Sequence, residues 1–82
     1  MPPVAMGTRL YVGNLPRGVN EAILRMAFGE GQRKVTSVTI DHQAGRLQQS
    51  GIVDMATHED ARAAMEAWHG RDLDGRNLTV NW

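Results

Sequence analysis

The sequence predicts an α+β fold in which a four-stranded antiparallel sheet carries two helices on one face. Four segments alternate between apolar and polar residues, as half-buried strands do, and two segments repeat apolar residues with helical spacing. The segments follow the order β-α-β-β-α-β, which is that of two split βαβ units in a ferredoxin-like sandwich. Right-handed crossovers bring both helices to one face and leave the other face for solvent or a ligand.

The first strand is predicted over residues 9–13. Its alternation places Leu10 and Val12 on the core face and Tyr11 on the outward face. Residues 14–18 follow with an asparagine, a proline and a glycine, so we predict a turn there.

Three further strands are predicted at residues 35–41, 48–55 and 77–81. Residues 42–46, between the first two of them, are predicted to form a loop or a wide hairpin. In the strand after this loop, we take the register that turns Gly51, Val53 and Met55 toward the core and Ile52 outward. Ile52 competes for the core in this assignment, because a slip of one residue turns every side chain to the opposite face.

The first helix is predicted over residues 21–28, with Asn20 as its N-cap. Its apolar residues at helical spacing are Ile23, Leu24, Ala27 and Phe28. Thr57 and Asp60 have the spacing of a capping box and begin the second helix. The apolar stripe of that helix and its final glycine are Ala61, Ala64, Met65, Trp68 and Gly70. We predict that Trp68, on this stripe, packs in the core.

The composition indicates one small domain. The 82 residues are 41% apolar and 22% charged, near the average of folded globular domains, and include no cysteine. Disulfides, thiolate metal sites and a cysteine nucleophile are thereby excluded, and no apolar run approaches the roughly 18 residues of a membrane span. We predict a flexible tail at residues 1–7 and a domain at residues 8–82, in the cytoplasm or, in a eukaryote, in the nucleus.

The sequence carries no catalytic or metal-binding pattern. His42, His58 and His69 lack partners at metal-binding spacing. Ser37 and Ser50 lie outside the Gly-x-Ser-x-Gly elbow of serine hydrolases. We therefore predict a binding domain without cofactor or metal. Nine basic residues balance nine acidic ones, so the net charge by itself does not point to a nucleic acid.

Residues Leu10–Leu15, which read Leu-Tyr-Val-Gly-Asn-Leu, match the hexamer motif of the RNA recognition motif family. Residues 59–80 are similar to that family's second helix and last strand. Residues 8–81 as a whole resemble the family, especially its short single-domain bacterial members. The family's octamer motif falls on residues 48–55 and is degenerate there. Its basic residue, its two base-stacking rings and its buried ring are replaced by Gln48, Ser50, Ile52 and Met55.

The resemblance implies a module that binds single-stranded RNA on the open face of the sheet. Of the three stacking rings of the family only Tyr11 is present. Stacking contributes about 1–3 kcal/mol per base, so the loss of two rings weakens binding by roughly 2–6 kcal/mol. We expect modest affinity and low sequence specificity. The RNA-binding residues that the resemblance implies are Arg9, Tyr11, Gly13, Asn14, Arg17, Arg46, Gln48, Ser50, Ile52, Arg76 and Asn81.

A second interpretation stays open, in which the same fold docks a protein through its sheet or helical face. The missing rings, the neutral net charge and the carboxylates of Asp41 and Asp54 on the outward face favour it, because these carboxylates repel phosphate. Trp82, after the last strand, is either a loose chain end or a substitute platform folded over the sheet. In both interpretations we expect a monomer that does not enter a membrane.

Overall fold

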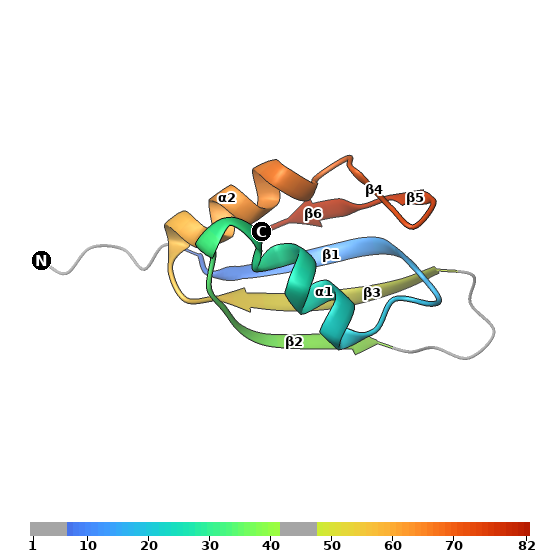
Figure 1. Cartoon of the computed structure of the whole chain (residues 1–82), viewed down its shortest axis with the longest axis horizontal. Helices are drawn as coiled ribbons and strands as arrows, with labels where there is room; N and C mark the ends of the chain where they lie inside the picture. Colours follow the sequence, from blue (N-terminus) through green and yellow to red (C-terminus); the bar gives the residue numbers. More distant parts are fainter. Residues whose placement is uncertain (1–6, 42–47) are drawn as a thin grey trace, which may run out of the picture.

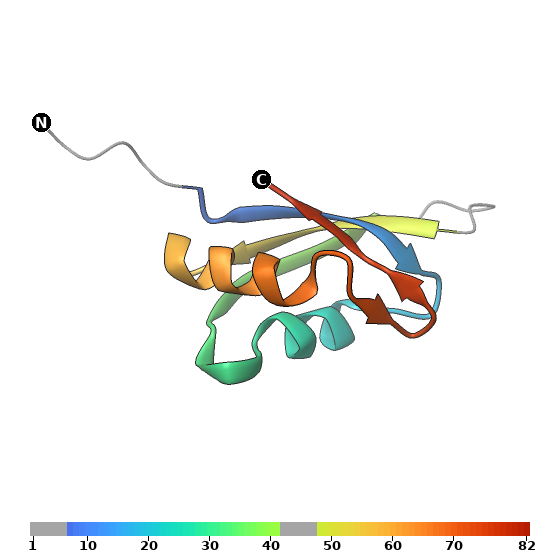
Figure 2. The same ribbon diagram turned by 90° about the horizontal axis from the view of Figure 1, so that it is seen from above.

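The structure, a computed structural model, describes residues 7–41 and 48–82. Figure 1 shows the elements in chain order, and Figure 2 shows the two layers that they form. These elements are β1 (Arg9–Pro16), α1 (Glu21–Phe28), a 3₁₀ turn (Glu30–Gln32), β2 (Val35–Asp41), β3 (Gln48–Met55), α2 (His58–Trp68), β4 (Asp72–Leu73), β5 (Arg76–Asn77) and β6 (Thr79–Asn81).

The main sheet has the strand order β2-β3-β1-β6, and all neighbouring strands are antiparallel. Both α-helices cover the same face of this sheet (Figure 2). The predicted α+β sandwich is therefore confirmed. The two central strands, β1 and β3, come from opposite halves of the chain, so the open face combines residues that lie about 40 positions apart, such as Tyr11 and Ile52.

Strand β1 is longer than predicted. It continues to Pro16, whereas a turn was predicted to begin at Asn14. The pairing with β3 shifts between Val12 and Leu15, and Asn14 adopts a positive φ of 61° at this bulge. Asparagine tolerates the left-handed conformation better than most residues, so the strand bends here and still buries the Leu15 side chain completely. The turn prediction was therefore wrong for residues 14–16.

The first helix has the predicted bounds and cap. The Asn20 side chain accepts a hydrogen bond from the Ile23 amide at 2.9 Å, which satisfies one of the free N–H groups at the helix start. Leu24, Ala27 and Phe28 are buried. Ile23, the fourth apolar residue at helical spacing, is 41% exposed, because the buried stripe of this two-turn helix is narrow and Ile23 lies on its rim.

The second helix also begins as predicted. Thr57 is its N-cap, and the Thr57 hydroxyl accepts a hydrogen bond from the Asp60 amide at 3.0 Å. The stripe packs on the sheet through Ala61, Ala64 and Trp68. The helix ends at its C-cap, His69, and Gly70 follows with a φ of 80°, a conformation that glycine adopts without the cost of a Cβ.

The C-terminal segment differs from the single strand predicted over residues 77–81. A short hairpin, β4–β5, forms around a turn at Asp74-Gly75, and β6 follows it. The outer edge of the last segment is covered by the chain after α2. Gly70 N donates to Leu78 O at 2.7 Å, and Val80 N donates to Nδ1 of His69 at 3.0 Å.

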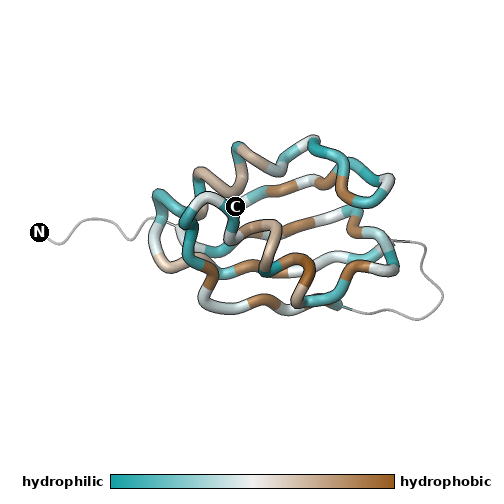
Figure 3. The backbone as a smooth tube through the Cα atoms, in the orientation of Figure 1, coloured by the Kyte–Doolittle hydropathy of each residue, from teal (hydrophilic) through white to brown (hydrophobic). Residues whose placement is uncertain are grey.

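The core lies between the helices and the sheet. Figure 3 shows apolar positions recurring along the strands, with polar positions between them. Phe28 and Trp68 join the two helices with parallel rings whose centroids are 6.2 Å apart. Trp68 Nε1 donates to Ala27 O at 2.9 Å, so its polar atom is satisfied inside the core. The prediction that Trp68 packs in the core is confirmed.

Candidate nucleic-acid interface

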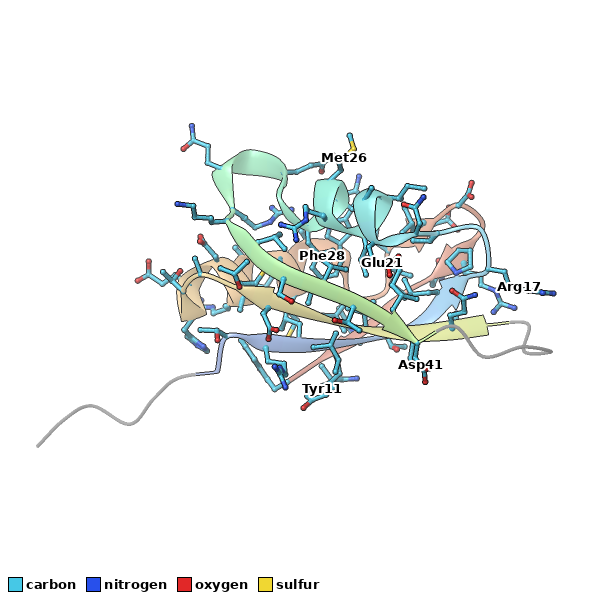
Figure 4. The ribbon with its side chains drawn as sticks, turned by 90° about the horizontal axis from the view of Figure 1, so that it is seen from below. Tyr11, Arg17, Glu21, Met26, Phe28 and Asp41 are labelled. Atoms are coloured by element: carbon cyan, nitrogen blue, oxygen red, sulfur yellow. The ribbon has the colours of Figure 1, made fainter. Side chains whose placement is uncertain are left out.

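The face of the sheet turned away from the helices carries the outward residues of β1, β2, β3 and β6. Figure 4 shows Tyr11 and Asp41 pointing away from the helical layer, whereas Phe28 lies between the helix and the sheet. The predicted register of β3 is confirmed, since Val53 and Met55 are buried and Ile52 lies on the open face.

Strand pairing places one residue from each strand in a row across the middle of the open face. We call this the central row, and it consists of Thr39, Ile52, Tyr11 and Asn81. The Tyr11 ring is 49% exposed, and Ile52 is half-buried beside it. An exposed ring with a neighbouring apolar side chain provides one platform for a flat aromatic ligand.

A hollow of about 360 Å³ lies on the open face beside the Tyr11 ring. It is present because Gly13 and Ser50 have no large side chains. A Cβ at Gly13 would lie only 2.5 Å from the Thr79 hydroxyl, so a side chain there would collide with the wall of the hollow. The residues that line the hollow are Tyr11, Val12, Gly13, Thr39, Asp41, Ser50, Gly51, Ile52, Thr79 and Asn81.

Arg9 and Asp54 form an ion pair at one end of the open face. Arg9 Nε donates to Oδ1 of Asp54 at 2.8 Å, and Nη2 approaches Oδ2 at 3.4 Å. The hydrogen bond to Asp54, followed by the charge of that carboxylate, raises the pKa of Arg9 above its ordinary value. The Asp54 charge, which was expected to repel phosphate, is thus compensated, and the Arg9 charge is shared with a carboxylate.

Asn14 and Arg76, both predicted to bind RNA, bind each other. Arg76 Nη1 donates to Oδ1 of Asn14 at 2.7 Å, and Nδ2 of Asn14 donates to Asn77 O at 2.8 Å. Asn14 therefore ties the bulge of β1 to the hairpin that precedes β6. Sequence reasoning missed this role, because the partners lie more than 60 positions apart and no local pattern links them.

The remaining predicted residues are distributed differently. Arg17 is exposed in the turn after β1, near one end of the sheet (Figure 4). Gln48 begins β3 opposite Pro16, and Arg46 lies outside the described residues. Ser50 and Asn81 are exposed on the open face and line the hollow. The predicted site residues that the structure brings together are thus those of β1, β3 and β6.

Trp82 does not cover the open face. Its ring lies nearly parallel to the His58 ring at the start of α2, with centroids 4.8 Å apart and an interplanar angle of 19°. The alternation of β6 agrees with this position, because Val80 is buried on the core side and Asn81 is exposed on the open face. The alternative in which Trp82 serves as a substitute platform over the sheet was wrong.

In residues 7–41 and 48–82, no three His, Asp or Glu side chains gather where they would hold a metal ion. Neither helix in these ranges is long and apolar enough to cross a membrane.

Comparisons with known proteins agree with the geometry. The sequence model of the RNA recognition motif matches residues 10–79. The chain is 40% identical over 74 residues to small ribosomal subunit protein cS22 of Spinacia oleracea, covering 89% of this chain and 28% of that protein. It is 39% identical over 74 residues to the glycine-rich RNA-binding protein blt801 of Hordeum vulgare, covering 89% of this chain and 46% of that protein. The chain spans about a quarter to a half of the length of these curated relatives.

Solved structures show the same fold. The crystal structure of the first two such domains of the yeast poly(U)-binding protein superposes with a TM-score of 0.84 at 26% identity, covering 90% of this chain and 44% of that chain. The crystal structure of an RNA-binding protein named PG1 superposes with a TM-score of 0.78 at 30% identity, covering 92% of both chains. With these structural likenesses and the sequence model matched over residues 10–79, the chain belongs to the RNA recognition motif family.

Proposed function

We propose that this domain binds single-stranded RNA on the open face of its sheet. The observation that carries the proposal is the exposed Tyr11 ring beside a hollow, on the face that neither described helix covers. Relatives named as an RNA-binding protein and as a chloroplastic ribonucleoprotein support RNA as the ligand. The protein-docking interpretation is not favoured, because the names of these relatives point to RNA and the Asp54 charge that supported docking is compensated by Arg9.

In this proposal each part of the open face has a separate task. Tyr11 stacks on one base, and Ile52 provides an apolar shelf next to it. The hydroxyl of Ser50 and the amide of Asn81 offer hydrogen bonds to base edges. Arg17 contacts phosphate from the turn beyond β1. Arg76 serves the site indirectly, since its guanidinium holds Asn14.

The electrostatics support modest affinity. The described open face carries the charges of Arg9, Asp54 and Asp41, and the first two neutralise each other. Phosphate attraction supplies much of the affinity of most RNA-binding proteins and weakens steeply with salt. With one stacking ring and little excess positive charge, we expect binding that is measurable at low salt and weak at physiological salt.

The decisive experiment compares Tyr11→Ala with Met26→Ala. Both remove an exposed large side chain, but Met26 is 74% exposed on α1, on the helical side of the domain (Figure 4). We expect Tyr11→Ala to weaken binding of short RNA oligomers by about 5- to 150-fold, the value of one stacked base. Fluorescence anisotropy at about 50 mM salt measures this loss.

Met26→Ala is expected to bind RNA like the wild type, and circular dichroism should show both variants folded. Absence of RNA binding by the wild-type domain, or equal binding by Tyr11→Ala, would remove the proposal. Copurification of the domain with a protein, in a complex that resists nuclease and moderate salt, would instead support the docking interpretation. The monomeric state and the cytoplasmic location remain predictions, and several relatives are named chloroplastic.

A further inference from the structure

We infer that the hollow beside Tyr11 reads the edge of one base, and that Asp41 makes it favour cytosine over uracil. This inference rests on the proposed RNA-binding function. It adds a preference at one nucleotide to binding that is otherwise tolerant of sequence. The ligand class is single-stranded RNA that presents an exocyclic amino group at this position.

The position of Asp41 follows from the register of three strands. Asp41 pairs with Ser50, and the next pair on the same face of these two strands is Thr39 with Ile52. Ile52 in turn lies opposite Tyr11. Asp41 is thus two strands from β1, a distance of about 10 Å, and one row beyond the Tyr11 platform. Its exposed side chain lines the hollow and points to the same side of the sheet as Tyr11 (Figure 4).

The floor of the hollow is open where the family's second ring would lie. Ser50 occupies that stacking position, and its small side chain leaves room between β1 and β2. A base held on Tyr11 therefore meets no second ring there, and its edge faces the polar wall formed by Asp41, Ser50 and Thr39. Serine in place of the family's ring at position 50 therefore removes one stacking surface and leaves the hydrogen-bonding groups of the hollow accessible to a base.

The chemistry of the wall discriminates between the two pyrimidines. An ionised carboxylate only accepts hydrogen bonds, whereas hydroxyl groups both donate and accept. Cytosine presents the N4 amino group as a donor, a group that Asp and Glu side chains accept from in nucleic-acid recognition. Uracil presents the O4 oxygen at the equivalent position, and two acceptors repel each other. Ser50 and Thr39 adapt to either base, so Asp41 determines the sign of the preference.

The second carboxylate of the face does not compete for this role. Asp54 is held by Arg9 through two contacts, and it lies at the opposite end of the face from Asp41. An ionised carboxylate has about four lone-pair sites, so Asp41 accepts a hydrogen bond from a base in addition to interactions within the chain. Repulsion between Asp41 and phosphate acts on every oligomer alike and cancels in a ratio of two affinities.

The test measures the affinity ratio for oligocytidylate and oligouridylate of about eight nucleotides at one fixed low salt concentration. We expect the wild-type domain to bind the cytidine oligomer about five- to tenfold more tightly. Asp41→Asn supplies an amide that donates to uracil O4, so this ratio should fall to about one or below. Asp74→Asn is the matched control, because it removes the same charge on the exposed turn between β4 and β5, where asparagine tolerates the φ of 54°.

Equal affinity of the wild-type domain for the two oligomers, or a uridine preference, would overturn the inference. So would an Asp41→Asn variant that keeps the wild-type ratio, or an Asp74→Asn variant that loses it. These results leave the proposed function standing if Tyr11→Ala still weakens both oligomers. If the wild-type domain binds neither oligomer, the proposed function and this inference both fail.

Discussion

The two faces of the sheet use neighbouring residues of the same strands for different purposes. On the face toward the helices, Leu10 and Val12 are at most 1% exposed. On the opposite face, Tyr11 between them is 49% exposed, and both α-helices in residues 7–41 and 48–82 lie on the other side of the sheet. Because successive side chains of a strand point to opposite faces, residues that stabilise the fold alternate along β1 with residues that can contact a ligand. Substitutions on the first face should change the free energy of unfolding, and substitutions on the second should change affinity.

The largest effect is expected on the packed face. Phe28→Ala removes a fully buried ring that stacks on Trp68. Such substitutions cost about 3–5 kcal/mol, which is most of the stability of a small domain. Urea unfolding followed by circular dichroism should show the variant largely unfolded at 25 °C. A stable Phe28→Ala domain would contradict the assignment of this ring to the core.

The resemblance assigns Asn14 to RNA binding, whereas the geometry gives its side chain a role in holding the fold together. Asn14→Ala loses the hydrogen bonds to Arg76 and Asn77 O and leaves alanine at a positive φ, which alanine tolerates less well than asparagine, so we expect a destabilisation of about 2–3 kcal/mol. Asn14→Gly loses the same bonds without the conformational cost and should be about 1 kcal/mol more stable than Asn14→Ala. Urea unfolding of both variants measures the difference. Equal stabilities would argue against strain at this bulge.

Ser50→Phe adds a second ring to the open face. One additional stacked base should tighten RNA binding by about 5- to 150-fold. The free energy of unfolding should change by less than about 0.5 kcal/mol, because Ser50 is exposed. The new ring also fills the hollow, so the cytosine preference should disappear while affinity rises. Anisotropy with both oligomers measures these two results, and a loss of affinity would mean that bases do not lie over β3.

The smallest expected effect concerns the ion pair. Asp54→Asn frees the Arg9 guanidinium from its carboxylate partner. If Arg9 then contacts a phosphate, the slope of log affinity against log salt concentration should steepen by about 0.7, the value for one added contact to a single strand. A salt titration of the variant and the wild type measures the slope. An unchanged slope would exclude Arg9 from the path of the RNA backbone.

Local patterns in the sequence predicted what depends on local chemistry. The caps at Asn20 and Thr57 have the expected hydrogen bonds, and β3 has the predicted bounds. The family assignment confirmed a binding domain instead of an enzyme. The errors arose where distant segments meet. Asn14 was predicted to begin a turn, but its side chain binds the hairpin more than 60 positions away and β1 continues through it.

The residues of the site were predictable only in part, again because some of their contacts join distant segments of the chain. Alternation alone placed Tyr11 and Ile52 on the open face. It did not reveal that Arg9 is paired across two strands, or that Ser50 leaves a hollow beside Asp41, because both depend on the register between strands. The sequence showed which charged residues lie on the open face. Only the pairing of β1 with β3 shows that the charges of Arg9 and Asp54 compensate each other.

The backbone contacts along β6 limit how copies of this domain can assemble. Strands at the edges of sheets pair readily with other chains unless something occupies their free N–H and C=O groups. Here His69 and Gly70 occupy that position beside β6, so in the described sheet the other border, β2, is the one left for such pairing. Pairing through β2 would join two copies, whereas on the side of β6 the Leu78 carbonyl and the Val80 amide already have partners within the chain.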